Sequence, residues 1–445
     1  MKQEKTLKGS IAGVLLLAMI PLTGAFEAPP QKPQRVFTTD LDHFWTAYDS
    51  IRTTKDSLKQ VRFFNRIYLS KGSPGLKAFQ EVKGNSVGLW VSSIRRYPRF
   101  WNSIRPRTQL TKAAAQEIEA SLAKLKTLYP ALRPSKVYFT MGNMRSSGIT
   151  KDSLVVIGAE MATGSPQTDV TRLPKNTAAF LSRYYKKGWS DDLVPVNVHE
   201  YVHTQLSGYG KSVLGQALNE GTCDFVTELV TGKAVPFPYL PYGKLHEAAL
   251  KERFKLEMFI PVYLNWSADQ APDDFTHVAD LNYYMGYAIC KAYYAQALNK
   301  TQAVRDMLTL DYTNDRAVQE FLEKSKYYPE EPIRQLREAF NQKQPDPTRV
   351  RPFVAENGTI DATTTQLTVD FPQPVSPYAS VRRGPRGEAT WPTVGALRFS
   401  GDNKSVIVPV QLQPAHDYEF IVAEGGSRSL EDYPLKSYLL KFSTK

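Results

Sequence analysis

Apolar residues follow two different periods along this chain. From residue 36 to about residue 340 they recur every three to four positions, the spacing of helices that bury one face. This pattern predicts helices over 40–51, 111–128, 212–230 and 279–298, one that begins near Pro195, and two or three short helices within 301–341. Thr111 and Ser212 are the expected N-caps of the second and third of these helices.

Alternation with a period of two predicts strands in two parts of the chain. Residues 136–141 and 153–158 predict a small sheet inside the helical part, able to pair with an extended peptide. After the Pro-rich stretch 342–347, five short alternating segments lie at 366–371, 396–400, 405–412, 418–422 and 437–443. The chain therefore predicts an α+β fold, with a mostly helical domain at 36–343 and an all-β sandwich domain at 350–445.

The N-terminus has the pattern of an export signal. Lys2, Lys5 and Lys8 precede an apolar run at 11–22, and small residues at 23–25 suit cleavage. We expect a signal peptide at 1–25, a Pro-rich linker at 26–35, and a periplasmic or secreted protein without a transmembrane segment after cleavage. An uncleaved N-terminal anchor is the alternative.

Charge and cysteine content add two expectations. The formal net charge is +12, with basic residues scattered along the chain, which favours attraction to acidic polymers or anionic membranes. No nucleic-acid motif is present, so we expect no nucleic-acid partner. Cys223 and Cys290 lie in two helices expected to pack together, either as a disulfide or as two buried thiols.

The chemistry concentrates in His199-Glu200-Tyr201-Val202-His203, an HExxH motif followed after 16 residues by Glu220. Positions i and i+4 share a helix face, so His199 and His203 can grip one metal ion. Glu220 is the expected third ligand, and three protein ligands leave a catalytic zinc one open position. Asp224, four residues beyond Glu220, is expected to orient a ligand histidine, and Gly221 to let the two helices approach closely.

These residues predict hydrolysis assisted by one Zn²⁺ per chain. Zinc polarises a carbonyl and acidifies water, and Glu200 acts as general base. The oxyanion donor is sought among Tyr283, Tyr284 and Tyr287, and we choose Tyr284 and Tyr287, which are three apart and face the same way. His277 is a second candidate donor. Tyrosines at helical spacing also fit an ordinary helical core.

At these residues the chain resembles the gluzincins, the zinc peptidases that include thermolysin. His199 and His203 match the paired ligands, Glu200 the base, Glu220 the third ligand and Asp224 the acidic residue four beyond it. Residues 36 to about 340 are more broadly similar to exported bacterial predicted zinc-dependent proteases, through the segment 37–49 and Tyr284-Met285-Gly286-Tyr287. The last 95 or so residues resemble bacterial Ig-like modules, at 418–422 and 442–444.

The resemblance implies a peptidase that acts on a peptide or protein substrate, with a C-terminal module able to bind a cell-envelope or surface partner. The 16-residue spacing differs from thermolysin, and no calcium loop is apparent, so thermolysin's substrate pockets are not transferred. Two alternatives stay open. One is a non-catalytic cell-envelope binding protein on the same scaffold, and the other is a metal-dependent peptidoglycan amide hydrolase.

Overall fold

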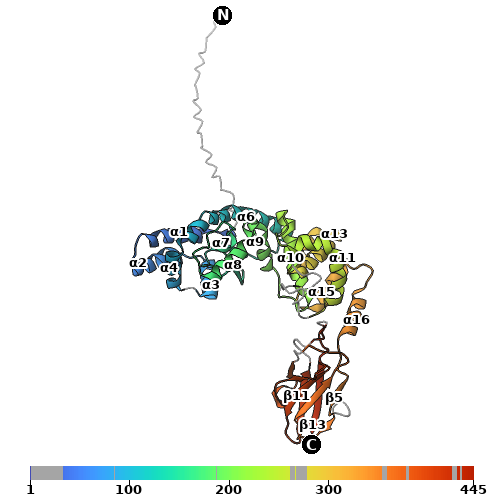
Figure 1. The fold of residues 1–445 in the computed structure, drawn as a ribbon. Helices are drawn as coiled ribbons and strands as arrows, with labels where there is room; N and C mark the ends of the chain where they lie inside the picture. The colour runs from blue at the N-terminus through green and yellow to red at the C-terminus, as the bar shows by residue number, and fades with distance from the viewer. Residues whose placement is uncertain are drawn as a thin grey trace. The chain divides into compact units, whose positions relative to one another are not determined.

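Helices dominate the first three quarters of the chain in a computed structural model (Figure 1). The structure describes Met1 and residues 34–84, 86–186, 188–260, 266, 278–352, 358–376, 380–422, 428–430 and 433–445. The predicted signal peptide and most of the predicted linker lie outside these ranges. None of the helices in the part of the chain so described is long and apolar enough to cross a membrane.

The first helical group runs from Thr39 to Leu128. Its helices are α1 (Thr39–Arg52), α2 (Ser57–Phe64), the π-helical turn η1 (Asn65–Leu69), α3 (Pro74–Lys83), α4 (Val87–Arg96), α5 (Pro98–Ile104) and α6 (Leu110–Leu128). Aromatic side chains form its core, among them Phe44, Trp90 and Trp101, whose ring centroids lie 5.2–6.3 Å apart. Such pairs add about 0.5–1.5 kcal/mol each beyond the area they bury.

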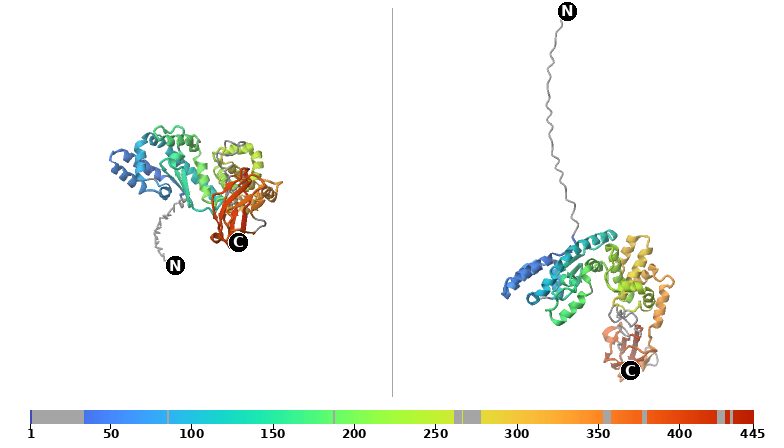
Figure 2. Two further views of the ribbon diagram at one scale, coloured as in Figure 1. Left: turned by 60° about the horizontal axis from the view of Figure 1, so that its bottom comes forward. Right: turned by 45° about the horizontal axis from the view of Figure 1, so that its top comes forward.

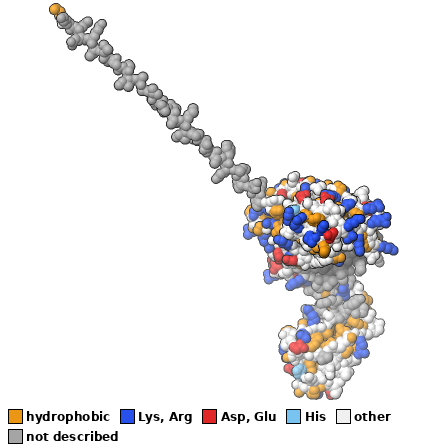
Figure 3. Space-filling model, turned by 90° about the vertical axis from the view of Figure 1, so that its left-hand side faces the viewer, with side chains coloured by type: hydrophobic (Ala, Val, Ile, Leu, Met, Phe, Trp, Pro, Cys, Tyr) orange, Lys and Arg blue, Asp and Glu red, His pale blue; other side chains and the backbone are white. Residues whose placement is uncertain are grey.

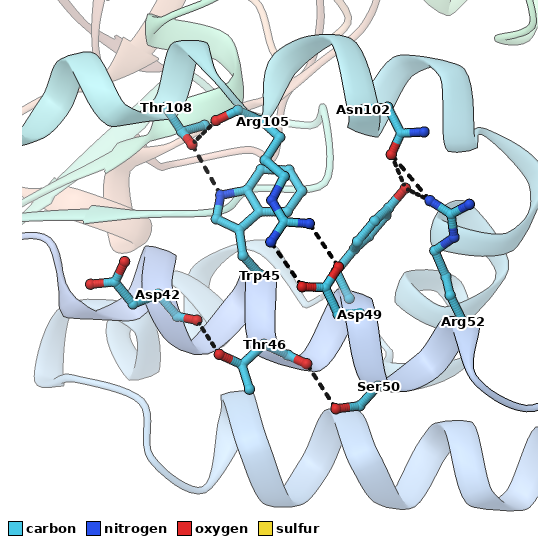
Figure 4. A network of polar contacts seen from close by, with 10 residues as sticks. Asp42, Trp45, Thr46, Asp49, Ser50, Arg52, Asn102, Arg105 and Thr108 are labelled. Atoms are coloured by element: carbon cyan, nitrogen blue, oxygen red, sulfur yellow. Dashed lines mark hydrogen bonds and ion pairs between the residues drawn. The ribbon is translucent and has the colours of Figure 1, made fainter.

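Polar contacts fasten α1 to α5 above this core (Figure 4). Arg105 pairs with both carboxylate oxygens of Asp49, at 2.7 and 2.8 Å. The Trp45 indole donates to Thr108 at 3.0 Å, and the Tyr48 hydroxyl donates to Asn102 at 2.8 Å. Trp45 and Tyr48 are buried, so two of these contacts satisfy polar atoms of side chains that belong to the apolar face of α1.

A four-stranded sheet lies inside the helical part, in the order β1-β2-β4-β3. Strands β1 (Val36–Phe37), β2 (Lys136–Thr140) and β4 (Leu154–Gly158) are parallel, and β3 (Gly148–Lys151) runs antiparallel to β4. The two predicted strands are confirmed as β2 and β4. β3 forms one edge of the sheet and β1 the other, and sequence patterning missed β3 because Ile149 is its only large apolar residue.

The second helical group follows the sheet. It contains α7 (Ala159–Ala162), α8 (Lys175–Tyr185), α9 (Leu193–His203), α10 (Val213–Thr231), α11 (Tyr239–Glu257), α13 (Leu281–Gln296), α14 (Lys300–Leu308), α15 (Asp315–Ser325) and α16 (Ile333–Lys343). α10 and α13 pack side by side (Figures 1 and 2). Both thiols of this helix pair, Cys223 and Cys290, are buried and free, the second of the two expected outcomes.

Two sequence expectations about local structure need correction. Thr111 is not an N-cap: α6 begins at Leu110, and the Thr111 hydroxyl is buried and donates to the carbonyl of Thr108 at 2.7 Å. Gly221 serves a different contact from the one expected. A Cβ on Gly221 would lie 2.1 Å from the backbone of Gly286, so this glycine lets α10 approach α13 rather than α9.

The C-terminal part is all-β and builds two sheets (Figure 1). One contains β10 (Arg398–Phe399), β11 (Ser405–Gln411), β7 (Gln366–Asp370) and β5 (Arg349–Arg351) in that order, with β9 (Thr393–Val394) also paired to β11. The other has the order β6 (Thr359–Ile360), β13 (Tyr438–Thr444), β12 (Asp417–Val422) and β8 (Val381–Arg383). Apolar residues of both sheets share one core. The α+β prediction is thus confirmed, with a mostly helical region followed by a two-sheet β region.

Candidate metal centre

Helix α9 presents its two histidines on one face. Val194, Val198 and Val202 recur every four residues and are buried, so the other side of this helix is held in the core. His199 and His203 are also one turn apart, and their ring centroids lie 4.8 Å from each other. His199 is 5% exposed, whereas His203 is half-buried.

Helix α10 brings carboxylates to these histidines. Ser212 caps its first turn, as predicted, with its hydroxyl accepting the N–H of Gly215 at 3.2 Å. Gly232 ends it in the left-handed conformation, at φ 75°. Between these ends, Glu220 and Asp224 lie one turn apart and are buried, 5% and 1% exposed.

Three side-chain atoms meet in a small triangle. Nε2 of His203 lies 3.1 Å from Nε2 of His199 and 3.0 Å from Oε2 of Glu220. Nε2 of His199 lies 3.4 Å from the same Glu220 oxygen. Ligand atoms about 2.0–2.1 Å from a tetrahedral zinc are about 3.3 Å from one another. The triangle therefore has the dimensions of three ligands around one ion.

The buried thiol of Cys223 is a fourth donor near this point. Ligand atoms of His199, His203 and Cys223 all lie within 4.8 Å of one another, so this His-His-Cys group could bind a metal ion. Burial raises the pKa of the Cys223 thiol well above its ordinary range, which opposes the thiolate form that metals bind. The donor set thus offers two histidines and a choice of Glu220 or Cys223.

Asp224 bonds to His199 on the side of the ring that faces away from the triangle. Its Oδ1 lies 2.7 Å from Nδ1 of His199, and its Oδ2 accepts the Tyr239 hydroxyl at 2.9 Å. A bond to Nδ1 fixes the ring orientation and leaves Nε2 directed at the triangle. Asp224 therefore contacts His199, one of the two histidines that the sequence offered as its partner.

The histidine and carboxylate groups of the site shift one another's pKa values. Burial disfavours a charged His199, but the charges of Asp224 and Glu220 outweigh it and raise the pKa of His199 well above its ordinary value. Burial opposes ionisation of Glu220, yet hydrogen bonds from the two histidines lower its pKa. A positive charge is favoured at this point of the fold, and a metal ion supplies one.

Glu200 directly follows His199 and lines a cleft to which the three triangle residues do not contribute. Its carboxylate is half-buried, and a cavity of about 250 Å³ extends from it toward the edge strand. The lining includes Gly148, Ile149, Thr150, Leu193, Val196 and Glu200. The cleft therefore lies between the HExxH helix and the edge strand β3.

The tyrosines of α13 divide between two environments. The hydroxyl of Tyr284 donates to Glu247 at 2.8 Å, and that of Tyr287 donates to Glu228 at 2.6 Å. Tyr283 interacts with Glu220: burial raises the pKa of the Tyr283 hydroxyl, and the nearby Glu220 charge raises it further. Of the three tyrosines, Tyr283 therefore interacts with Glu220, whereas Tyr284 and Tyr287 bond to other glutamates. His277 lies outside the described residues.

Sequence reasoning missed two further tyrosines at this site. Tyr239 reaches Asp224, as described above, and Tyr209 donates to Oε1 of Glu220 at 3.3 Å. Tyr209 is 46% exposed and stands between Gly208 and Gly210, 11 residues before Glu220. Tyr209 could have been found from the sequence, because it lies between two glycines in the loop that joins α9 to α10.

Comparisons with known proteins give no family. No protein-family model matches the sequence, and no curated protein matches it. Among solved structures, domains 1–6 of the surface layer protein SbsC share 12% identity at a TM-score of 0.18, covering 91% of this chain and 44% of that one. The N-terminal part of the same bacterial S-layer protein gives 11% identity and a TM-score of 0.18, covering 92% and 77%. This chain spans less than half of the first structure, and likeness at this TM-score carries no argument.

Proposed function

We propose that this protein is a zinc-dependent peptidase with one Zn²⁺ per chain. The observation that carries the proposal is the buried triangle of His199 Nε2, His203 Nε2 and Glu220 Oε2, with edges of 3.0–3.4 Å. Imidazole and carboxylate donors in a set of three suit a catalytic zinc, which keeps a further position open. Glu220 is the third ligand in this proposal.

Geometry and charge favour Glu220 over Cys223. The Glu220 oxygen is already at ligand spacing from both histidines, and its lowered pKa keeps it ionised at neutral pH. Cys223 shares a wider group of 4.8 Å and must lose a proton that burial retains. Three ligands are then complete without the thiol.

The remaining residues take roles that their positions allow. Bound zinc supplies a Lewis acid that polarises a carbonyl and lowers the pKa of water. Glu200, which follows His199 on α9 and lines the cleft, accepts the proton of the attacking water and passes it to the leaving amine. Asp224 holds His199 in orientation, and Tyr283, which interacts with Glu220, donates its hydroxyl proton to the developing oxyanion.

An extended peptide is the substrate that this cleft fits. One side of β3 is paired with β4, and in the sheet order its other side is the edge. A peptide can add to such an edge as a further strand, held by main-chain hydrogen bonds. Ile149, Leu193 and Val196 line the same cleft and offer apolar contact to its side chains.

Export and a C-terminal partner belong to the same proposal. The pattern of residues 1–25 supports a periplasmic or secreted enzyme, and the two-sheet region would hold it on a cell-envelope or surface partner. Both statements rest on the sequence pattern and the presence of the β region.

Activity on a quenched fluorescent peptide library tests the function. The parent should cleave peptides, and Glu200→Gln should retain zinc and lose cleavage by several orders of magnitude, because only the base is removed. Cleavage of peptidoglycan fragments but of no peptide would favour the amide-hydrolase alternative. A folded parent that binds no zinc and cleaves neither would favour the non-catalytic binding protein.

A further inference from the structure

Positive charge is not scattered along the chain, as first expected, but is concentrated in the first group of helices. Between Ile51 and Lys112 the sequence has 14 Lys and Arg residues but only two acidic ones, Asp56 and Glu81. This excess equals the formal net charge of the whole chain, +12, so the remaining residues balance one another. Figure 3 views the end of the molecule where α2 and α4 lie, and Lys and Arg side chains outnumber acidic ones on that face.

Some of these cations are used by the fold. Arg105, Arg99 and Lys112 each pair with an aspartate, at 2.7–2.9 Å. Arg107 donates to the carbonyl of Thr163 and to the hydroxyl of Ser190. Figure 4 shows one such case, where Arg105 closes on Asp49. These side chains hold α5 and α6 in place and are not available to a ligand.

Three cations on α2 and η1 are not paired with carboxylates in this way within the part of the chain that the structure describes. Lys59, Arg62 and Arg66 recur at three- and four-residue spacing, which places them along one helix face. Among the described residues no carboxylate lies within ion-pair distance of any of the three. Asp56, the nearest acidic residue in sequence, is committed to the helix end, where it accepts the N–H groups of Leu58 and Lys59.

The three cations line an open groove of about 440 Å³. Its lining residues are Lys59, Arg62, Phe63, Asn65, Arg66 and Ser70, with no acidic residue among them. The guanidinium of Arg66 lies 5.9 Å from the ring centroid of Phe63, so charge and aromatic surface are adjacent. The π-helical turn that begins at Asn65 carries one side of this groove.

Exposed leucines lie on α2 and on the helix α4 that contacts it. Leu58, in the first turn of α2, is 68% exposed. Leu89, on the neighbouring helix α4, is 50% exposed. A soluble polyanion offers only charge to such a surface. An anionic lipid bilayer offers phosphate groups to the cations and acyl chains to the leucines.

We propose that the α2–η1 groove docks this protein on membranes that contain anionic phospholipids. Lys59, Arg62 and Arg66 contact lipid phosphates, and Leu58 enters the interface. Each Lys or Arg near an anionic surface contributes roughly a fivefold factor in binding, so the three together contribute roughly 100-fold. The surface lies outside the metal-binding residues, and this docking does not depend on peptidase activity.

Vesicle co-sedimentation of the full protein tests this proposal. The parent should bind vesicles of phosphatidylcholine with about one third phosphatidylglycerol, release them at about 1 M salt, and ignore pure phosphatidylcholine. The triple variant Lys59→Gln, Arg62→Gln, Arg66→Gln should bind roughly 100-fold more weakly. Its thermal unfolding should match the parent, since these side chains are exposed.

The matched control neutralises the same residue types elsewhere. Arg172, Lys175 and Arg183 are exposed on and before α8, and their replacement by Gln removes the same net charge. This control should lose less than about fivefold in vesicle binding. Equal losses in the two triple variants would overturn the proposal, because binding would then follow net charge alone.

A second variant separates lipid from soluble polyanion. Leu58→Ser should weaken vesicle binding several-fold and leave binding to soluble polyphosphate unchanged. A parent that binds polyphosphate but no vesicle would overturn membrane docking and assign the groove to a soluble anionic polymer.

Discussion

The contact between α10 and α13 allows a prediction that links helix packing to the metal centre. Gly286 on α13 lies directly against α10, and a Cβ there would stand 1.6 Å from the carbonyl oxygen of Ala217 and 2.3 Å from its carbon. Ordinary van der Waals contact begins at 3.4 Å. The obstructing atoms are backbone, so Gly286→Ala requires the helices to separate locally by more than about 1 Å.

That separation acts on stability and on the metal site together. Overpacking of this kind costs typically about 1–3 kcal/mol, and each kcal/mol lowers the Tm of a large domain by roughly 2–4 °C. Ala217 is one turn before Glu220, whose oxygen lies 3.0 Å from His203 Nε2. Metal–ligand distances tolerate only about 0.2 Å, so we expect zinc affinity to fall at least about tenfold.

Gly88→Ala is the matched control. Gly88 is exposed in α4, and a Cβ there would meet only the Ser86 hydroxyl, at 4.0 Å. This change should raise stability by about 0.5–1 kcal/mol and leave zinc affinity unchanged. Differential scanning calorimetry and chelator competition measure both quantities. A Gly286→Ala protein with the parent's Tm and zinc affinity would refute the link between this glycine contact and Glu220.

The other predictions concern single side chains. Asp224→Ala should weaken zinc binding about 10–100-fold in chelator competition, and an unchanged affinity would exclude its positioning role. Tyr283→Phe should lower kcat about 100-fold or more on a cleaved peptide, whereas Tyr287→Phe should stay within severalfold of the parent; the reverse order would restore the original choice. Burial raises the pKa of Glu160 above 4.5 in the folded protein. The protonated carboxyl therefore favours the folded state, and this stabilisation is lost as pH rises through the folded pKa. Glu160→Gln should therefore lose less Tm than the parent between pH 4.5 and about pH 7, and parallel Tm profiles would contradict this sign.

The sequence anticipated the parts of the site that one helix fixes by itself. His199 and His203 share a face because positions i and i+4 always do, and the same rule places Asp224 one turn beyond Glu220. The contact between α9 and α10 could be predicted because a metal held by the two histidines of HExxH needs a third ligand, and Glu220 was the candidate. Helix ends followed from local chemistry at Ser212 and failed at Thr111, where the chain had already turned helical.

Features set by distant contacts could not be read in advance. The edge strand β3 has almost no apolar alternation, and its pairing with β4 defines it. Which α13 tyrosine faces Glu220 depends on the rotation of that helix, and one position separates Tyr283 from Tyr284. Lys59, Arg62 and Arg66 have helical spacing that is visible in the sequence, but the groove that they line appears only in the folded chain.

Zinc stoichiometry by mass spectrometry of the purified protein tests the central proposal most directly. The parent and Cys223→Ala should each hold one zinc per chain, while His203→Ala and Glu220→Gln should hold almost none, with all four folded by circular dichroism. Such a result would establish the His-His-Glu centre. Zinc retained in Glu220→Gln but lost in Cys223→Ala would assign the third ligand to the thiol, and a folded, zinc-free parent would contradict the proposed peptidase.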